Sequence, residues 1–212
     1  MRYVRVAGKL LISVGCGVLM FVAWTLWGTG IYTSQQQNAL AEAFAGAPPV
    51  VLDPGSEDVA VPESFRPAPG EHAFKMSIPT IDFEQIVVEG VGSDALKKGP
   101  GHYPECRPGF ERPLCTPFEE MWPGENGRVI ISGHRTTYGA PFYNLDKLKR
   151  GDEIVTETSW GDFTYKVTIK TIVEPDSPLV VIKNDEPELV LTTCNPRFSA
   201  AERLIVYAEL VT

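Results

Sequence analysis

The sequence predicts an all-β domain of short strands, preceded by one N-terminal membrane-spanning helix. Residues 163–170 alternate apolar and polar side chains with a period of two, which is typical of a strand with one buried face. Turn signals such as Pro123-Gly124 and Gly151-Asp152 separate the apolar runs. Many short strands without long helices between them indicate a closed barrel or a sandwich.

The membrane helix is predicted over residues 10–32. Its uncharged run from Leu10 to Ile31, roughly 22 residues at about 1.5 Å each, spans about 33 Å and is long enough for a bilayer core. A cleaved signal peptide has an apolar region of only about 7–15 residues, so the length favours a lasting anchor. Residues 1–9 carry three basic and no acidic side chains, so we expect this end in the cytoplasm and the rest outside the cell.

Residues 33–71 are predicted to be an extracytoplasmic linker, because six prolines between positions 48 and 69 oppose regular structure. Residues 72–212 have the size of one domain. The chain has 19 basic and 27 acidic residues, and only three basic ones precede residue 33. The exported part therefore has 16 basic against 27 acidic residues, a net charge of −11. That balance argues against a nucleic-acid partner, which needs a basic surface.

The strands of the domain are expected where apolar runs lie between turn signals. Besides residues 163–170, these runs are residues 74–78, 86–91, 128–131, 153–158, 179–182, 189–194 and 203–211. Short helical turns are expected near residues 94–97, 142–148 and 199–202.

Cys194 is the candidate nucleophile. It ends an apolar strand and is followed by Asn195-Pro196, which stops the strand, so the thiol is held rigidly and stays reachable. A free thiol has a pKa near 8.5, and only a few per cent is thiolate at pH 7, so it needs a base beside it. The alternative is a buried structural cysteine without reactivity.

His134 is the candidate base, because it follows a strand directly and an imidazole can take the thiol proton and return it to a leaving amine. Arg203 begins the last strand and is the candidate to stabilise an oxyanion or hold a substrate carbonyl. Arg135 and Arg197 compete for this role, and spacing alone does not choose between the three arginines. His102 is interpreted as structural, with a place in the cleft as the alternative.

These motifs resemble the sortase family, the membrane-anchored cysteine transpeptidases of Gram-positive bacteria. The resemblance runs from about residue 74 to 212 and is carried by residues 133–142 (GHRTTYGAPF), residues 191–194 (LTTC) and Arg203. It implies an eight-stranded sortase-type β-barrel with short helices. It also implies a triad of Cys194 as nucleophile, His134 as general acid and base, and Arg203 as stabiliser.

The implied reaction is cleavage of a C-terminal sorting motif between Thr and Gly. The thioacyl intermediate then passes to an amine of a cell-wall precursor or a pilin. Residues 136–142 are most similar to class E, the actinobacterial housekeeping type, which implies a preference for Leu-Ala-x-Thr-Gly. We expect substrate contacts from Thr137, Tyr138, Leu191 and Thr193, with packing as a core aromatic the alternative for Tyr138.

Three other functions are less favoured. Residues 53–55 (Asp-Pro-Gly) faintly resemble the lid of class C, the pilin-polymerising sortases, but an aromatic residue is missing after the proline. An L,D-transpeptidase would need a different cysteine motif. A tethered binding domain without catalysis would leave Cys194 inert.

Cys106 and Cys115 are predicted to form a disulfide, which the extracellular environment permits. Pro108-Gly109 between them gives a turn, and closing about ten residues stabilises by nearly 3 kcal/mol on the chain-entropy model. A zinc site with His102 has too few well-spaced ligands. We therefore expect no metal and no cofactor, and a monomeric enzyme.

Overall fold

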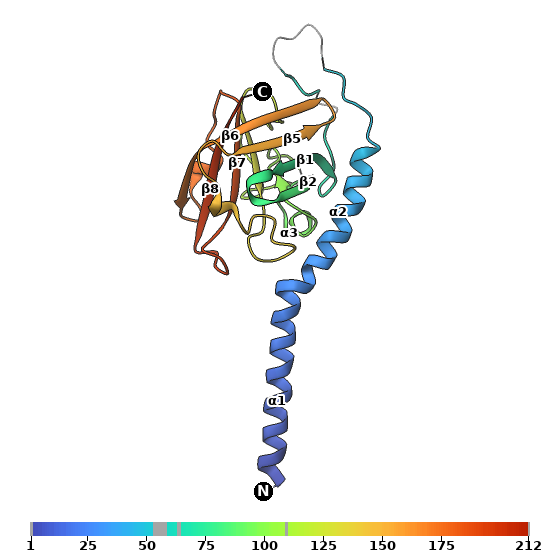
Figure 1. Cartoon of the computed structure of the whole chain (residues 1–212), viewed down its shortest axis with the longest axis vertical. Coiled ribbons are helices and arrows are strands. Elements are labelled where there is room, and N and C mark those ends of the chain that lie inside the picture. Colours follow the sequence, from blue (N-terminus) through green and yellow to red (C-terminus); the bar gives the residue numbers. More distant parts are fainter. Residues whose placement is uncertain (1, 53–58, 63–64, 109, 212) are drawn as a thin grey trace.

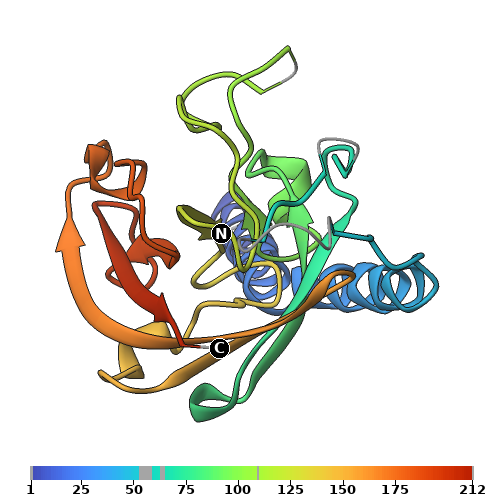
Figure 2. The same cartoon turned by 90° about the horizontal axis from the view of Figure 1, so that it is seen from above.

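The structure, a computed structural model, describes residues 2–52, 59–62, 65–108 and 110–211 (Figure 1). Within these residues, eight strands close into a barrel in the order β1-β2-β3-β4-β7-β8-β6-β5, so the predicted fold class is confirmed (Figure 2). The strands are β1 (His72–Ile78), β2 (Phe83–Glu89), β3 (Gly101–His102), β4 (Arg128–Ser132), β5 (Glu153–Thr158), β6 (Gly161–Val173), β7 (Glu188–Asn195) and β8 (Glu202–Leu210). The lid-like residues 53–55 lie outside the described residues.

Strand direction places the important chain ends at one edge of the barrel. β4 and β7 are parallel neighbours with Ser132 opposite Thr192, so both strands end at the same edge. β8 is antiparallel to β7 and therefore begins at that edge.

The core lies inside the barrel and follows the alternation of each strand. On β7, Leu189 and Leu191 belong to the core cluster, whereas Val190 and Thr192 point to the outer face, because successive strand residues face opposite sides. Fully buried Phe74 and Tyr165 are among the largest core side chains. Burying a side chain of this kind stabilises the fold by roughly 1.5–3 kcal/mol.

Two local predictions are wrong. Residues 179–182 do not form a strand, because Pro178–Val180 is a 3₁₀ turn, η4, in the connection between β6 and β7. Pro178 has no N–H for a ladder, and the Ser177 hydroxyl accepts a hydrogen bond from the Leu179 amide. Residues 199–202 are not helical, and β8 already begins at Glu202. The other helical turns occur as α3 (Ser93–Leu96) and η3 (Leu145–Lys147).

A continuous helical segment precedes the barrel. It comprises α1 (Arg2–Ala23), the π-helical turn η1 (Trp24–Gly28) and α2 (Thr29–Ala45). The segment bends between α1 and α2 (Figure 1), and π-helical turns are a common cause of such bends. The segment is long and apolar enough to cross a membrane. Residues 33–45, which were predicted to belong to an irregular linker, are helical. The prolines of that linker begin only at Pro48, and good helix formers precede them. α2 lies along the barrel, whereas α1 extends away from it (Figure 1).

Candidate active site

Cys194 and Arg203 are direct neighbours across two strands. They are paired residues in the antiparallel ladder of β7 and β8, and directly opposed side chains in such a ladder point to the same face. Both residues are half-buried, so their side chains remain reachable from the outer face of the barrel. The structure thus places the predicted nucleophile beside the predicted arginine.

His134 lies on the other side of Cys194. The β4–β7 pairing continues past Ser132, because the Gly133 amide donates to the Thr192 carbonyl at 3.1 Å and the Thr193 hydroxyl donates to the Gly133 carbonyl at 2.7 Å. β4 and β8 flank β7 on opposite sides, and His134 follows two residues after the end of β4, so the chain enters the His134 loop on the side of β7 that is opposite to Arg203. The candidate residues therefore come from β7, from β8 and from the loop that directly follows β4, three neighbouring parts of one barrel edge.

The structure separates the three candidate arginines. Arg135 is buried and donates from one terminal nitrogen to the Cys194 carbonyl at 3.2 Å and to the Asn195 side chain at 2.7 Å. Arg197 binds the Tyr143 carbonyl at 3.1 Å and Asp146 at 2.7 Å. Arg203 uses one terminal nitrogen for two nearby carbonyls, both at 3.1 Å, and it alone of the three lines the groove beside the thiol.

Arg135 acts as a clamp that sequence reasoning missed. Besides its bonds to the end of β7, its guanidinium pairs with Asp146 at 3.0 Å. The clamp fastens the loop after β4 to the residues that follow Cys194. Its position next to His134 in sequence is the only local signal, and it did not distinguish a structural from a catalytic role.

Tyr138 packs against His134 rather than in the core. The two rings lie 5.1 Å apart, centroid to centroid, and are tilted by 35°. Burial lowers the pKa of His134 below its usual 6.5.

Tyr138, Gly139 and Ala140 are three consecutive residues with positive φ, of 51°, 74° and 46°. Non-glycine residues adopt this conformation only where the surroundings enforce it.

A groove of about 750 Å³ runs along the outer face, and its lining includes Arg203, the ladder partner of Cys194. Strands form its floor, and two long connections, between β3 and β4 and between β6 and β7, form its walls. Residues that define these surfaces are Ser132, Thr192, Arg203, Leu114, Phe118 and Val181.

Two predicted substrate contacts are on the wrong face of β7. Leu191 is fully buried in the core cluster, and the Thr193 hydroxyl is buried and already bound to Gly133. Thr192, which the prediction missed, faces the groove, and within the described residues its buried hydroxyl has no hydrogen-bond partner. Thr137 is half-buried, and its carbonyl closes a turn by accepting from the Ala140 amide at 2.9 Å.

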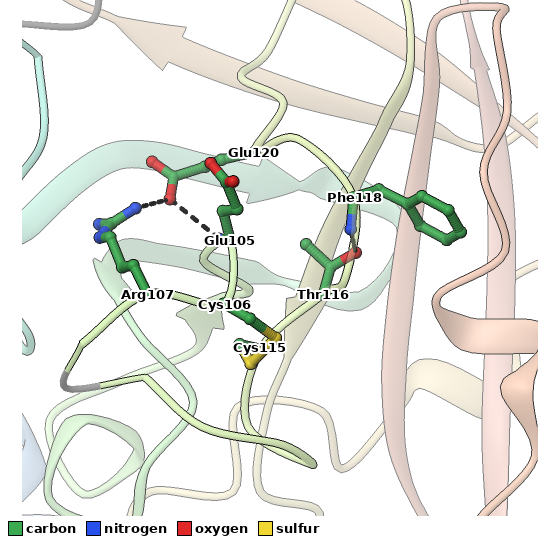
Figure 3. Close-up of a disulfide and its surroundings, with 7 residues drawn as sticks. All are labelled: Glu105, Cys106, Arg107, Cys115, Thr116, Phe118 and Glu120. Carbon is green, nitrogen blue, oxygen red and sulfur yellow. Dashed lines mark hydrogen bonds and ion pairs between the residues drawn. A yellow bond between two sulfur atoms is a disulfide. The ribbon is translucent and has the colours of Figure 1, made fainter.

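The predicted disulfide between Cys106 and Cys115 is present (Figure 3). It closes a loop in the connection between β3 and β4. Leu114 and Cys115 from this loop line the groove. The bridge therefore shapes one wall of the groove rather than taking part in the chemistry.

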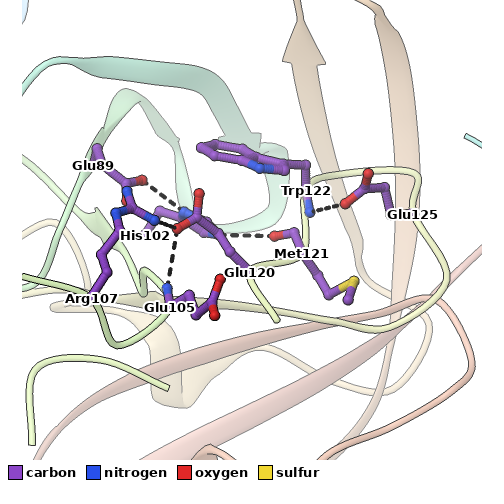
Figure 4. A network of polar contacts seen from close by, with 8 residues as sticks. All are labelled: Glu89, His102, Glu105, Arg107, Glu120, Met121, Trp122 and Glu125. Atoms are coloured by element: carbon purple, nitrogen blue, oxygen red, sulfur yellow. Dashed lines mark hydrogen bonds and ion pairs between the residues drawn. The ribbon is translucent and has the colours of Figure 1, made fainter. Parts of the chain in front are cut away.

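A buried polar network holds the same connection against the barrel (Figure 4). His102 is buried and bonds through Nδ1 to Glu89 and through Nε2 to the Met121 carbonyl, both at 2.9 Å. Arg107 pairs with Glu120 and lies 3.6 Å from Glu89. Burial raises the pKa of Glu89. Burial alone would lower the pKa of His102, but Glu89 and Glu120 outweigh it and raise that pKa. His102 is thus structural and does not line the groove.

In the part of the chain that the structure describes, no group of three or more His, Cys, Asp or Glu side chains is placed to hold a metal ion. The chemistry that the described residues support is that of a thiol, an imidazole and a guanidinium. Such a site, beside a groove, is that of a cysteine acyltransferase.

Comparison with known proteins leads to the same class and specifies it. Residues 76–211 match the sortase domain, and the chain belongs to the sortase family of cysteine transpeptidases. Sortase D of Bacillus subtilis (strain 168) is 35% identical over 154 residues, which cover 70% of this chain and 69% of that protein. Sortase SrtE1 of Streptomyces coelicolor is 31% identical over 218 residues, which cover 98% of this chain but only 57% of that relative.

Solved structures of sortases are also similar to this chain. Sortase E1 from Streptomyces coelicolor, with a tripeptide in its active site, has a TM-score of 0.57 and 28% identity, and the match covers 69% of this chain and 92% of that chain. A Clostridium perfringens Sortase D5 transpeptidase has a TM-score of 0.57 and 32% identity, covering 69% of this chain and 83% of that chain. The expected similarity to class E is confirmed, and a similarity to sortase D stands beside it.

Proposed function

We propose that this chain is a membrane-anchored transpeptidase that cleaves a sorting motif of the Leu-Ala-x-Thr-Gly kind between Thr and Gly. Cys194 holds the acyl group, and an amine of the cell wall accepts it. The observation that carries this proposal is the place of Cys194 between the end of β4, which leads into His134, and Arg203 on β8.

The reaction follows from these positions. His134 takes the thiol proton as Cys194 Sγ attacks the threonine carbonyl carbon, and the Arg203 guanidinium donates hydrogen bonds to the oxyanion that forms. His134 gives a proton to the glycine nitrogen as the C–N bond breaks, which leaves a thioester on Cys194. An acceptor amine then attacks the thioester, His134 takes the amine proton, and the thiolate leaves.

The groove supports recognition of an extended peptide. Thr192 and Arg203 lie among the strand residues that form its floor. Tyr138, beside His134, narrows the space near the second motif residue, so a small alanine is favoured over proline there. Thr137 is the remaining candidate contact.

The proposed topology places residues 1–9 in the cytoplasm and the barrel outside the cell. Three basic residues at the N-terminal end and the apolar helical segment after them support this orientation. In this arrangement the enzyme is a single-pass protein of the cell membrane and acts as a monomer.

Mass spectrometry of the full chain in detergent micelles, mixed with a Leu-Ala-x-Thr-Gly peptide, tests the proposal. We expect a thioester adduct on Cys194 whose mass reports a cut between Thr and Gly, and transfer of the acyl group to an added amine. The Cys194→Ala variant is the control and should form no adduct. A wild-type protein that reacts with a thiol-directed reagent but forms no adduct with this or a Leu-Pro-x-Thr-Gly peptide would refute the proposed substrate class.

A further inference from the structure

The loop that carries Tyr138 receives a contact from outside the barrel. The Thr29 side-chain oxygen, in the first turn of α2, accepts a hydrogen bond from the Tyr138 amide at 3.0 Å. The Gly30 backbone lies so close to Gly139 that a Cβ added to Gly30 would stand 3.6 Å from the Gly139 backbone. The helix that leaves the membrane therefore reaches the loop beside His134.

The rest of α2 is held against the barrel along one face. Thr33 is 1% exposed and donates to the Lys97 carbonyl at 2.8 Å. The Gln37 side-chain amide accepts from the Ile86 N–H at 2.8 Å and donates to the Ile86 carbonyl at 3.0 Å. It thus satisfies backbone groups of β2 that lie beyond its short pairing with β3. Leu40 packs into a small core cluster with Ile86. Positions 29, 33, 37 and 40 share one helix face, and they make α2 part of the catalytic domain.

The supported loop has a conformation that needs such a contact. Tyr138 and Ala140 have positive φ although neither is glycine, and such residues persist only where the surrounding structure holds them. Tyr138 in turn packs on the His134 ring. The chain of contacts therefore runs from Thr29 through the Tyr138 amide and ring to the imidazole.

We propose that α2 orients the active site, and that Thr29 is a positioning residue which holds His134 through Tyr138. This inference rests on the proposed function of His134 as general acid and base. The inference also shortens the segment that can lie in the bilayer, because Thr29 contacts the barrel and cannot be inside the membrane. Residues 10–28 remain for the membrane, about 28 Å of helix, which still matches a hydrocarbon core of about 30 Å. The His134 loop then lies directly at the membrane surface.

The test compares Thr29→Val with Thr25→Val in the full chain in detergent micelles. Valine keeps the shape of threonine and removes the acceptor. Thr25 is the matched control, because its hydroxyl bonds only within the helix, to the Val22 carbonyl at 2.9 Å. For Thr29→Val we expect kcat for peptide cleavage to fall about five-fold, the factor that one lost hydrogen bond provides, with KM within about two-fold of wild type. Thr25→Val should match wild type, and Thr29→Ser, which restores the oxygen, should recover kcat.

Two further measurements separate positioning from folding and from the proposed function. Thr29→Val should unfold within a few degrees of Thr25→Val, as the loss of one hydrogen bond requires, but should show faster amide hydrogen exchange in residues 135–142, a readout that needs no substrate. Gly30→Leu, which pushes on the loop, should act like Thr29→Val, whereas Gly30→Ala fits the space. Equal kcat and exchange for the two threonine variants, or a fall in Tm that leaves Thr29→Val partly unfolded at the assay temperature, would overturn the inference. Faster exchange in a chain whose wild type cleaves no peptide would refute the proposed function and leave the support of the loop standing.

Discussion

Removing the Cys106–Cys115 bridge should lower stability and weaken substrate binding while sparing the chemical step. The perturbation is the double variant Cys106→Ala/Cys115→Ala. The bridge joins residues nine positions apart, and on the chain-entropy model a loop of this length stabilises the folded state by about 3 kcal/mol. For a domain of this size, that corresponds to a fall in Tm of roughly 10 °C.

The effect on catalysis follows from the position of the loop. Leu114 and Cys115 line the groove, whereas Cys194 and His134 come from the ends of other strands. Loss of the bridge therefore loosens one groove wall, so KM should rise and kcat should remain near the wild-type value when both are measured well below the Tm.

Thermal unfolding followed by circular dichroism, with steady-state peptide cleavage, measures both effects. Cys16→Ala is the control, because Cys16 is an unbridged cysteine in α1, outside the barrel, and it should change neither quantity. An unchanged Tm in the double variant would mean that the network around His102 holds the loop without the bridge. A large fall in kcat would refute the view that the loop only shapes the groove.

Four other results are expected. Arg203→Lys keeps the charge but loses the fork of donors, so kcat in steady-state assays should fall about 10²- to 10³-fold, and near-wild-type activity would count against an oxyanion role. The His134 ring, followed by NMR, should titrate below 6.5 because burial lowers its pKa, and a midpoint above 6.5 would contradict this. Thr192→Val should not lower the Tm in thermal unfolding, since the fold leaves this buried hydroxyl unpaired, and a clear fall in Tm would contradict this. The raised pKa of His102 beside Glu89 adds stability that is complete below pH 6.5 and is lost as pH rises through the folded-state pKa. In urea unfolding, the stability advantage of wild type over His102→Gln should therefore shrink as the pH rises above 6.5, and a constant advantage would argue against the shift.

Much of the barrel could be predicted from local patterns. Period-two alternation marks β6, and turn residues bound most other strands, because each strand buries one face and each turn needs particular backbone angles. The predicted strand at residues 179–182 is wrong because a short apolar run fits a strand and a turn equally well. Pro178 and the Ser177 cap decide that segment locally, and neither changes its apolar composition.

The candidate site was predicted in part. Cys194 stands out because it ends a buried strand, but neighbours in sequence do not share its face. Thr193 and Leu191 point into the core, while Thr192 faces the groove, since strand residues alternate. The register between β7 and its partner strands decides which residues meet, and no local pattern contains it.

Residue types and their spacing alone were enough to predict a β domain after a long apolar helix, a disulfide, and a candidate cysteine nucleophile near a strand end. These are local properties, set by periodicity, charge and chemical reactivity. Only the tertiary structure assigned Arg135 to a clamp and Arg203 to the groove, and only it brought α2 against the His134 loop. Those outcomes depend on contacts between segments up to about 110 residues apart, such as Thr29 and Tyr138, and such contacts form only when the closed barrel sets the direction and register of every strand.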